Sequence, residues 1–132
     1  MEGDDAKTIL LIEDDDDTRP FLNQQLRTEG YRVLVAPDDA RALKRIGDGL
    51  ASAALILINQ GKQPDDCIAT GRRVRRQAGL GDDVPVVVLA STHGGDMEGK
   101  NVLVGAHVWV SYLVDGRQLP GLLARILRVD SS

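Results

Sequence analysis

The sequence has few aromatic residues, one cysteine and no long apolar run. Phe, Tyr and Trp make up 3% of its 132 residues, so we expect a core built from Leu, Val, Ile and Ala. Cys67 is the one cysteine, which excludes an internal disulfide and favours a reducing compartment. No stretch approaches the roughly 20 apolar residues of a membrane span. The acidic start, Met1–Asp5, does not resemble a signal peptide, so we expect a cytoplasmic protein.

Charge and length place the chain among soluble globular domains. It is 42% hydrophobic and 27% charged, with a formal net charge of -4. That acidic balance argues against nucleic-acid binding, which usually needs a basic surface. The length suits one domain over residues 1–132, with a core over about 7–129. Four arginines crowd one segment, and we expect a solvated helix face there, with a docking site for an acidic partner as the alternative: Arg72, Arg73, Arg75 and Arg76.

Apolar runs alternate with helical patterns along the chain. Strands are predicted over 8–12, 31–36, 54–58, 84–89 and 108–110, and helices over 15–28, 37–47, 67–77 and 119–129. Strict alternation of this kind indicates an α/β fold. We predict a flavodoxin-like, doubly wound sheet of five parallel strands in the order 2-1-3-4-5, with helices on both faces.

The segment Ser91–Gly105 is the exception to this pattern. The alternation requires a helix there, but the segment contains Gly94, Gly95, Gly99 and Asn101. Each interior glycine costs about 1 kcal/mol of helix stability relative to alanine. We therefore expect a short or mobile helix.

Five consecutive acids follow the first strand. The apolar run Ile9–Ile12 leads directly into Glu13–Asp17, at the sheet edge where ligands bind in such folds. For Asp15–Asp17 we expect helix capping. For Glu13 and Asp14, which end the strand, weak magnesium or calcium binding of roughly millimolar affinity is the alternative.

Asn59 ends the third strand, so it should converge with Glu13 and Asp14. At this point the chain resembles a response-regulator receiver domain, the phosphoacceptor module of bacterial two-component signalling. The resemblance covers about Lys7 to Arg128. Its marks are Ile9–Asp17, Glu29–Tyr31, Leu55–Asn59, Arg72–Arg75, Pro85–Leu89 and Gly105–Ala106.

The resemblance implies an active site that this sequence has largely lost. Glu13 and Asp14 match the acids that help to hold magnesium in receivers. Asn59 stands where the phosphoacceptor aspartate is expected, Ala90 where a threonine or serine binds the phosphoryl group, and Tyr112 where a lysine pairs with it. An asparagine amide is a poor nucleophile for phosphoryl transfer, a phenol is neutral at pH 7, and alanine donates no hydrogen bond. We therefore predict no catalytic residues, no enzyme activity and no required cofactor.

We interpret the chain as a degenerate, phosphorylation-independent pseudo-receiver. It would act on a protein partner, a sensor kinase or an output protein, through the family's face of helix 4, strand 5 and helix 5. We expect neither nucleic-acid nor membrane binding. The formation of a homodimer is left as an alternative. Trp109 matches the family's switch aromatic, and we expect its ring to pack inward into space left by Ala90.

Two other functions are left open. The first is a phosphate-responsive receiver with another acceptor, such as Asp15, Asp65 or Asp66. The second is a small-ligand-binding module on the same fold, with its ligand between Glu13, Asn59 and Tyr112. Cys67 stands at the start of the arginine-rich helix, where receivers often have glycine, and we expect it to be structural.

Overall fold

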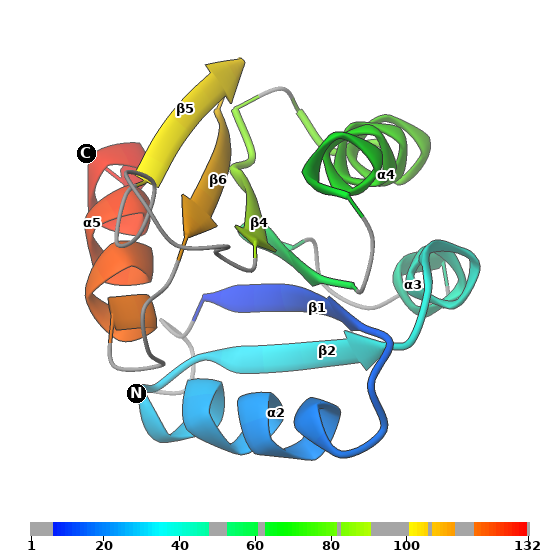
Figure 1. The fold of residues 1–132 in the computed structure, drawn as a ribbon, viewed down its shortest axis with the longest axis horizontal. Coiled ribbons are helices and arrows are strands. Elements are labelled where there is room, and N and C mark those ends of the chain that lie inside the picture. Colours follow the sequence, from blue (N-terminus) through cyan, green and yellow to red (C-terminus); the bar gives the residue numbers. More distant parts are fainter. Residues whose placement is uncertain are drawn as a thin grey trace.

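The computed structural model describes residues 7–47, 53–60, 63–81, 83–90, 101–105, 107–112 and 118–131. The strands are β1 (Thr8–Glu13), β2 (Arg32–Ala36), β3 (Leu55–Asn59), β4 (Val86–Ala90), β5 (Asn101–Gly105) and β6 (Val108–Tyr112). The helices are α2 (Thr18–Thr28), α3 (Asp39–Gly47), α4 (Pro64–Gln77) and α5 (Gln118–Ser131). Strands and helices alternate from β1 to β4, as predicted (Figure 1).

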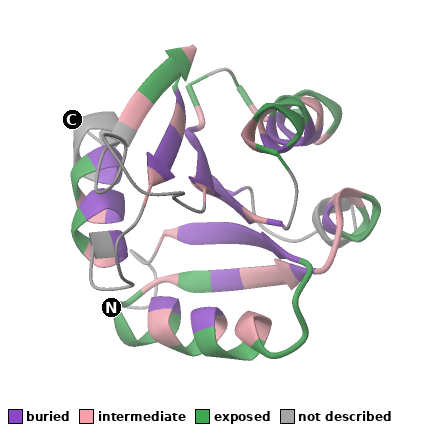
Figure 2. Ribbon diagram, viewed as in Figure 1, coloured by how far each residue is buried: buried purple, intermediate pink, exposed green. Residues whose placement is uncertain are grey.

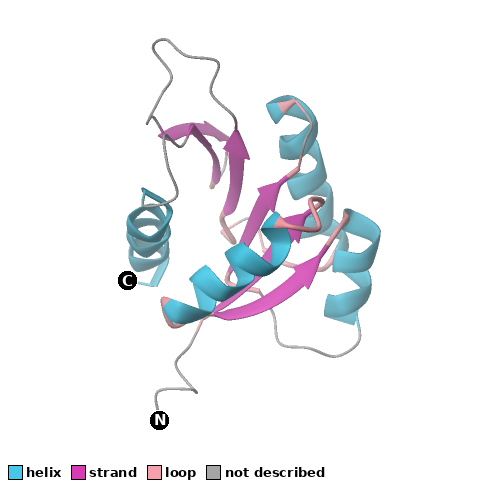
Figure 3. Cartoon of the chain, turned by 60° about the horizontal axis from the view of Figure 1, so that its bottom comes forward, coloured by secondary structure: helices cyan, strands magenta, loops and turns pink. Residues whose placement is uncertain are grey.

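The strands form one sheet in the order β2-β1-β3-β4-β6-β5. The first five strands of this order are parallel, and β5 pairs antiparallel with β6 at the edge. Helices α2 and α5 cover one face of the sheet, while α3 and α4 cover the other (Figures 1 and 3). The predicted α/β fold and the order of its parallel strands are confirmed, and β5 is an addition.

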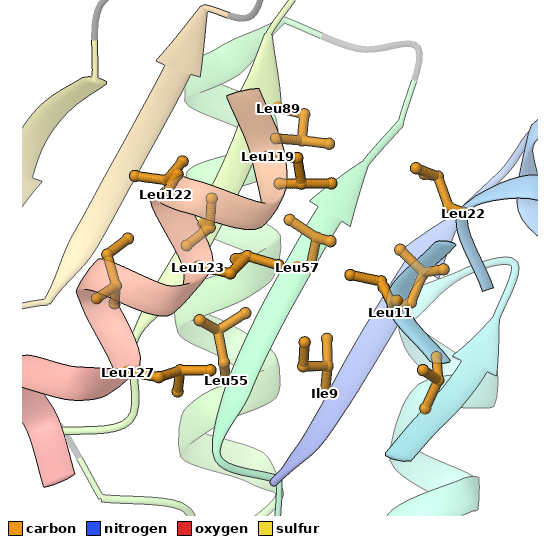
Figure 4. Close-up of a cluster of buried hydrophobic side chains, with 14 residues drawn as sticks. Ile9, Leu11, Leu22, Leu55, Leu57, Leu89, Leu119, Leu122, Leu123 and Leu127 are labelled. Carbon is orange, nitrogen blue, oxygen red and sulfur yellow. The ribbon is translucent and has the colours of Figure 1, made fainter. Parts of the chain in front are cut away.

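The core lies on both faces of the sheet, as an apolar run such as Ile9–Ile12 requires. All four of its residues are completely buried. Because side chains alternate along a strand, Ile9 and Leu11 join α2 and α5 in one cluster. Leu10 and Ile12 join α3 and α4 in a second cluster. Figure 2 shows the resulting buried centre, and Figure 4 shows leucines of α5 packed on β1 and β3.

The predicted helix over Ser91–Gly105 is wrong at its C-terminal end. Residues 101–105 form the strand β5, in which Val102 lies opposite Val110 and Leu103 opposite Trp109. Val102 and Val104 have β-branched side chains that favour strands over helices, and β6 offers this segment a partner. Residues 91–100 lie outside the described part of the chain.

The ends of two helices follow from single residues. Pro64 is the first residue of α4, where its missing N–H is not needed, so this helix begins three residues before the predicted start at Cys67. Gly30 follows α2 with a φ of +97°, a conformation that glycine adopts without steric cost. Within the described residues, no helix is long and apolar enough to cross a membrane.

Candidate functional site

Glu13 and Asn59 meet at the carboxyl ends of neighbouring strands. They are register partners in the parallel pair β1 and β3. The Asn59 Nδ2 group donates a hydrogen bond of 2.6 Å to Glu13 Oε1. The predicted convergence of these strand ends is thereby confirmed.

The Glu13 carboxylate is buried and accepts bonds at both oxygens. Its second oxygen, Oε2, accepts the backbone N–H of Asp15 at 3.0 Å, and the residue is 2% exposed. Burial raises the pKa of Glu13, and the hydrogen bonds from Asp15 and Asn59 oppose that rise. Because an ionised carboxylate only accepts, the Asn59 amide must turn its NH2 group toward it.

The next acids serve the start of α2. Asp15 Oδ2 accepts the backbone N–H groups of Asp17 (3.1 Å) and Thr18 (2.7 Å). Hydrogen bonds from Thr18 lower the pKa of Asp15. This confirms capping for Asp15. Asp16 forms an ion pair with Arg19 instead, and Asp17, at the N-cap position, makes no capping bond through its side chain.

Arg19 belongs to this cluster, although the sequence analysis did not single it out. Its Nη1 group donates to the backbone oxygen of Glu13 at 2.9 Å, and its Nη2 group pairs with Asp16. The signal in the sequence was the i, i+3 spacing of Asp16 and Arg19, which brings two side chains together on a helix.

Hydrogen bonds within the protein already engage part of the oxygen set that a divalent cation would use. Magnesium binding needs oxygen atoms with free lone pairs directed at the ion. Both Glu13 oxygens already accept N–H groups, and Asn59 turns a donor toward Glu13. Among the residues that the structure describes, no three His, Cys, Asp or Glu side chains are grouped to hold a metal. The hydrogen bonds occupy part of the oxygen set, and the weak magnesium site predicted at Glu13 and Asp14 stays a prediction.

Ala90 and Tyr112 are register partners at the ends of β4 and β6. Both pack against the cluster beneath α3 and α4, together with Ile58 and Val110. Glu13 and Asn59 instead continue the alternation of Leu11 and Leu57, which face α2 and α5. The lost phosphate-binding positions therefore do not share a strand face with Asn59. Their predicted roles as remnants of a phosphate site stay predictions.

Trp109 is half-buried and packs against the cluster beneath α2 and α5. Ala90 packs on the opposite face of the sheet. The expected inward packing is present, but its expected reason is wrong, because the ring does not fill the space beside Ala90. Strand alternation separates the two side chains.

The arginines of α4 divide into two groups. Arg75 is buried and donates to the backbone oxygen of Val84 at 3.0 Å, and Arg73 pairs with Asp39 of α3. Arg72 and Arg76 are exposed. The solvated face predicted for all four residues is thus correct for two of them. Cys67, at the start of the same helix, is buried in the core.

Solved structures show which fold this is. The chain resembles a sensor protein from Polaromonas sp. JS666, with a TM-score of 0.68 and 21% identity over 94% of this chain and 98% of that one. It also resembles the receiver domain of the hybrid histidine kinase CckA, with a TM-score of 0.62 and 23% identity over 91% of this chain and 98% of that one. The fold is therefore the receiver-domain fold.

Curated relatives add sequence similarity. The chain is 33% identical over 86 residues to the uncharacterized transcriptional regulatory protein YrkP of Bacillus subtilis, matching 65% of this chain and 34% of that protein. It is 28% identical over 123 residues to the phosphate regulon transcriptional regulatory protein PhoB of Pseudomonas aeruginosa, matching 93% of this chain and 52% of that protein. The chain thus spans about a third to half of these relatives. No protein-family model matches it. The chain is thus similar in fold to receiver domains and similar in sequence to part of bacterial transcriptional regulatory proteins.

Proposed function

We propose that this chain is a pseudo-receiver of two-component signalling, which binds a protein partner without being phosphorylated at residue 59. The observation that carries the proposal is the hydrogen bond from Asn59 to Glu13. Phosphoryl transfer needs an anionic oxygen nucleophile and charge stabilisation. Position 59 instead offers a neutral amide that is held by its neighbour.

The residues that would otherwise stabilise a phosphoryl group support the same proposal. Ala90 has no hydrogen-bond donor, and Tyr112 has no positive charge. Both pack on the face of the sheet that α3 and α4 cover. Strand alternation assigns Asn59 to the other face, which α2 and α5 cover. A non-enzymatic module that is recognised through its surface is consistent with this arrangement.

The partner face that we propose consists of β5, β6 and α5. The family's face would use a helix before β6, but residues 101–105 form β5 here. Leu103 is 55% exposed and Val104 is 41% exposed, and β5 contains no charged residue. An uncharged strand at a sheet edge readily pairs with another chain. A sensor kinase or an output protein is the partner class that we propose.

A non-standard acceptor is the rival function. Asp65 and Asp66 are exposed on the first turn of α4. The Oδ2 atom of Asp15 already accepts hydrogen bonds from two backbone N–H groups. Among the described residues, no hydrogen-bond donor contacts the Asp65 or Asp66 carboxylate, whereas phosphoryl transfer needs several donors around the acceptor. We therefore favour the phosphate-independent function.

Phosphodonor treatment tests the proposal. The protein is incubated with acetyl phosphate and magnesium, and its intact mass and peptide map are then measured. A receiver with its acceptor aspartate, treated alongside, confirms that the donor is active. We expect no phosphate on this chain, and the same affinity for a purified partner kinase or output domain with and without treatment. Stable phosphate mapped to residue 59, Asp15, Asp65 or Asp66 would contradict the proposal.

A further inference from the structure

The turn after β1 concentrates negative charge. Glu13–Asp17 are five acids in succession, and like charges this close repel one another. At least three of the five carboxylates accept hydrogen bonds from N–H groups of the protein. Glu13 accepts from Asn59 and the Asp15 backbone, Asp15 from the Asp17 and Thr18 backbone, and Asp16 from Arg19.

Arg19 brings a permanent positive charge to this turn. Its guanidinium donates to the Glu13 backbone oxygen and to the Asp16 carboxylate, so it bridges the first and the fourth acid. Its backbone N–H also donates to the backbone oxygen of Asp15 at 3.0 Å. The side chain is 22% exposed, so water screens its charge less than that of a surface arginine.

We propose that Arg19 and Asn59 together replace a divalent cation at this turn. Arg19 supplies positive charge, and Asn59 supplies a neutral donor to the buried Glu13 carboxylate. The turn therefore folds without metal. The inference deepens the proposed function, because it names what keeps the pseudo-receiver site in one state.

Two substitutions that leave negative charge uncompensated should make the turn depend on a cation. An Asn59→Asp substitution places a second carboxylate within hydrogen-bond distance of Glu13, and a divalent cation between the two would relieve the repulsion. Arg19→Gln removes the internal positive charge and leaves the acids in place. Asn59→Ala removes the donor without adding charge, so its loss of stability should not be recovered by a cation.

Thermal unfolding of the purified protein in EDTA and in about 10 mM magnesium chloride, at matched ionic strength, measures this dependence. We expect the midpoint of the wild-type protein to stay unchanged. The midpoints of Asn59→Asp and Arg19→Gln should fall in EDTA and recover by roughly 5 °C in magnesium.

Arg41→Gln is the matched control. Arg41 pairs with Asp38 at the same i, i+3 spacing as Arg19 with Asp16, but the Arg41 side chain is 70% exposed, compared with 22% for Arg19. At matched ionic strength, we expect the unfolding midpoint of this variant to be the same in EDTA and in magnesium chloride.

A magnesium shift in the wild-type protein as large as that of Asn59→Asp would overturn the inference. An Arg19→Gln response no larger than that of Arg41→Gln would also overturn it, whether or not Asn59→Asp folds. Neither outcome bears on phosphate at residue 59. Conversely, a phosphorylated wild-type protein would contradict the proposed function and leave the magnesium result standing.

Discussion

At the scale of single residues, the buried carboxyl group of Glu13 determines how the site responds to pH. Burial raises its pKa above the ordinary value of 4.5. The folded protein therefore holds this proton more tightly than the unfolded chain. The resulting stabilisation is fully present below pH 4.5 and is lost as the pH rises through the folded-state pKa.

We predict that Glu13→Gln removes the decrease in stability that the wild-type protein shows as the pH rises through the pKa of Glu13. Glutamine keeps the shape of glutamate, and both hydrogen bonds persist if the Asn59 amide turns its oxygen toward the new NH2 group. The free energy of unfolding of the variant, relative to the wild-type protein, should rise as the pH is raised from about 4.5 to 7. Urea titrations at several pH values measure the difference. A difference that does not change with pH would contradict the burial argument.

The sequence predicted the positions of residues that lie at the ends of strands. Glu13 and Asn59 were placed together because parallel strands present their ends at one edge. The role of Arg19 was not found, because its bond to the Glu13 backbone oxygen depends on how the turn folds. The separation of Trp109 from Ala90 depends on which sheet face each side chain occupies.

At the scale of elements, α4 packs closely on β4 because Gly71 has no side chain. A Cβ atom built at Gly71 would collide with Val86 Cγ1 and lie 3.0 Å from Ile58 Cδ1. Gly121 of α5 has no neighbour within 4 Å of such an atom. The same substitution should therefore act in opposite directions in these two helices.

We predict that Gly71→Ala lowers the free energy of unfolding by about 1–3 kcal/mol through overpacking. Gly121→Ala should raise it by up to about 1 kcal/mol, because alanine is the better helix former. Chemical denaturation of both variants measures these changes. Equal effects of the two substitutions would contradict the packing of α4 described above.

The element that sequence patterns missed is β5. The glycines and Asn101 argued against a stable helix over 91–105, and residues 101–105 indeed form no helix. The strand itself could not be predicted from the sequence, because three apolar residues make an antiparallel edge strand only where a partner such as β6 is available. The five parallel strands were predictable because buried runs such as Leu55–Ile58 have few alternatives.

At the scale of the whole molecule, the added edge strand changes the surface that a partner meets. We predict that Leu103→Lys weakens binding to a purified kinase or output domain by at least about tenfold. Stability should change by less than about 0.5 kcal/mol, since Leu103 is exposed. Phe21→Lys is the matched control, because Phe21 is 66% exposed on α2, outside the proposed partner face. Equal weakening by both substitutions would contradict the assignment of this face.

The central claim is that Asn59 forms a hydrogen bond with Glu13 and does not accept a phosphoryl group. A crystal structure determined with magnesium and beryllofluoride, a mimic of the phosphoryl group, tests it most directly. We predict that Asn59 Nδ2 stays within hydrogen-bond distance of Glu13, with neither metal nor mimic beside residue 59. Beryllofluoride joined to residue 59, with magnesium held by Glu13 and Asp14, would contradict the account.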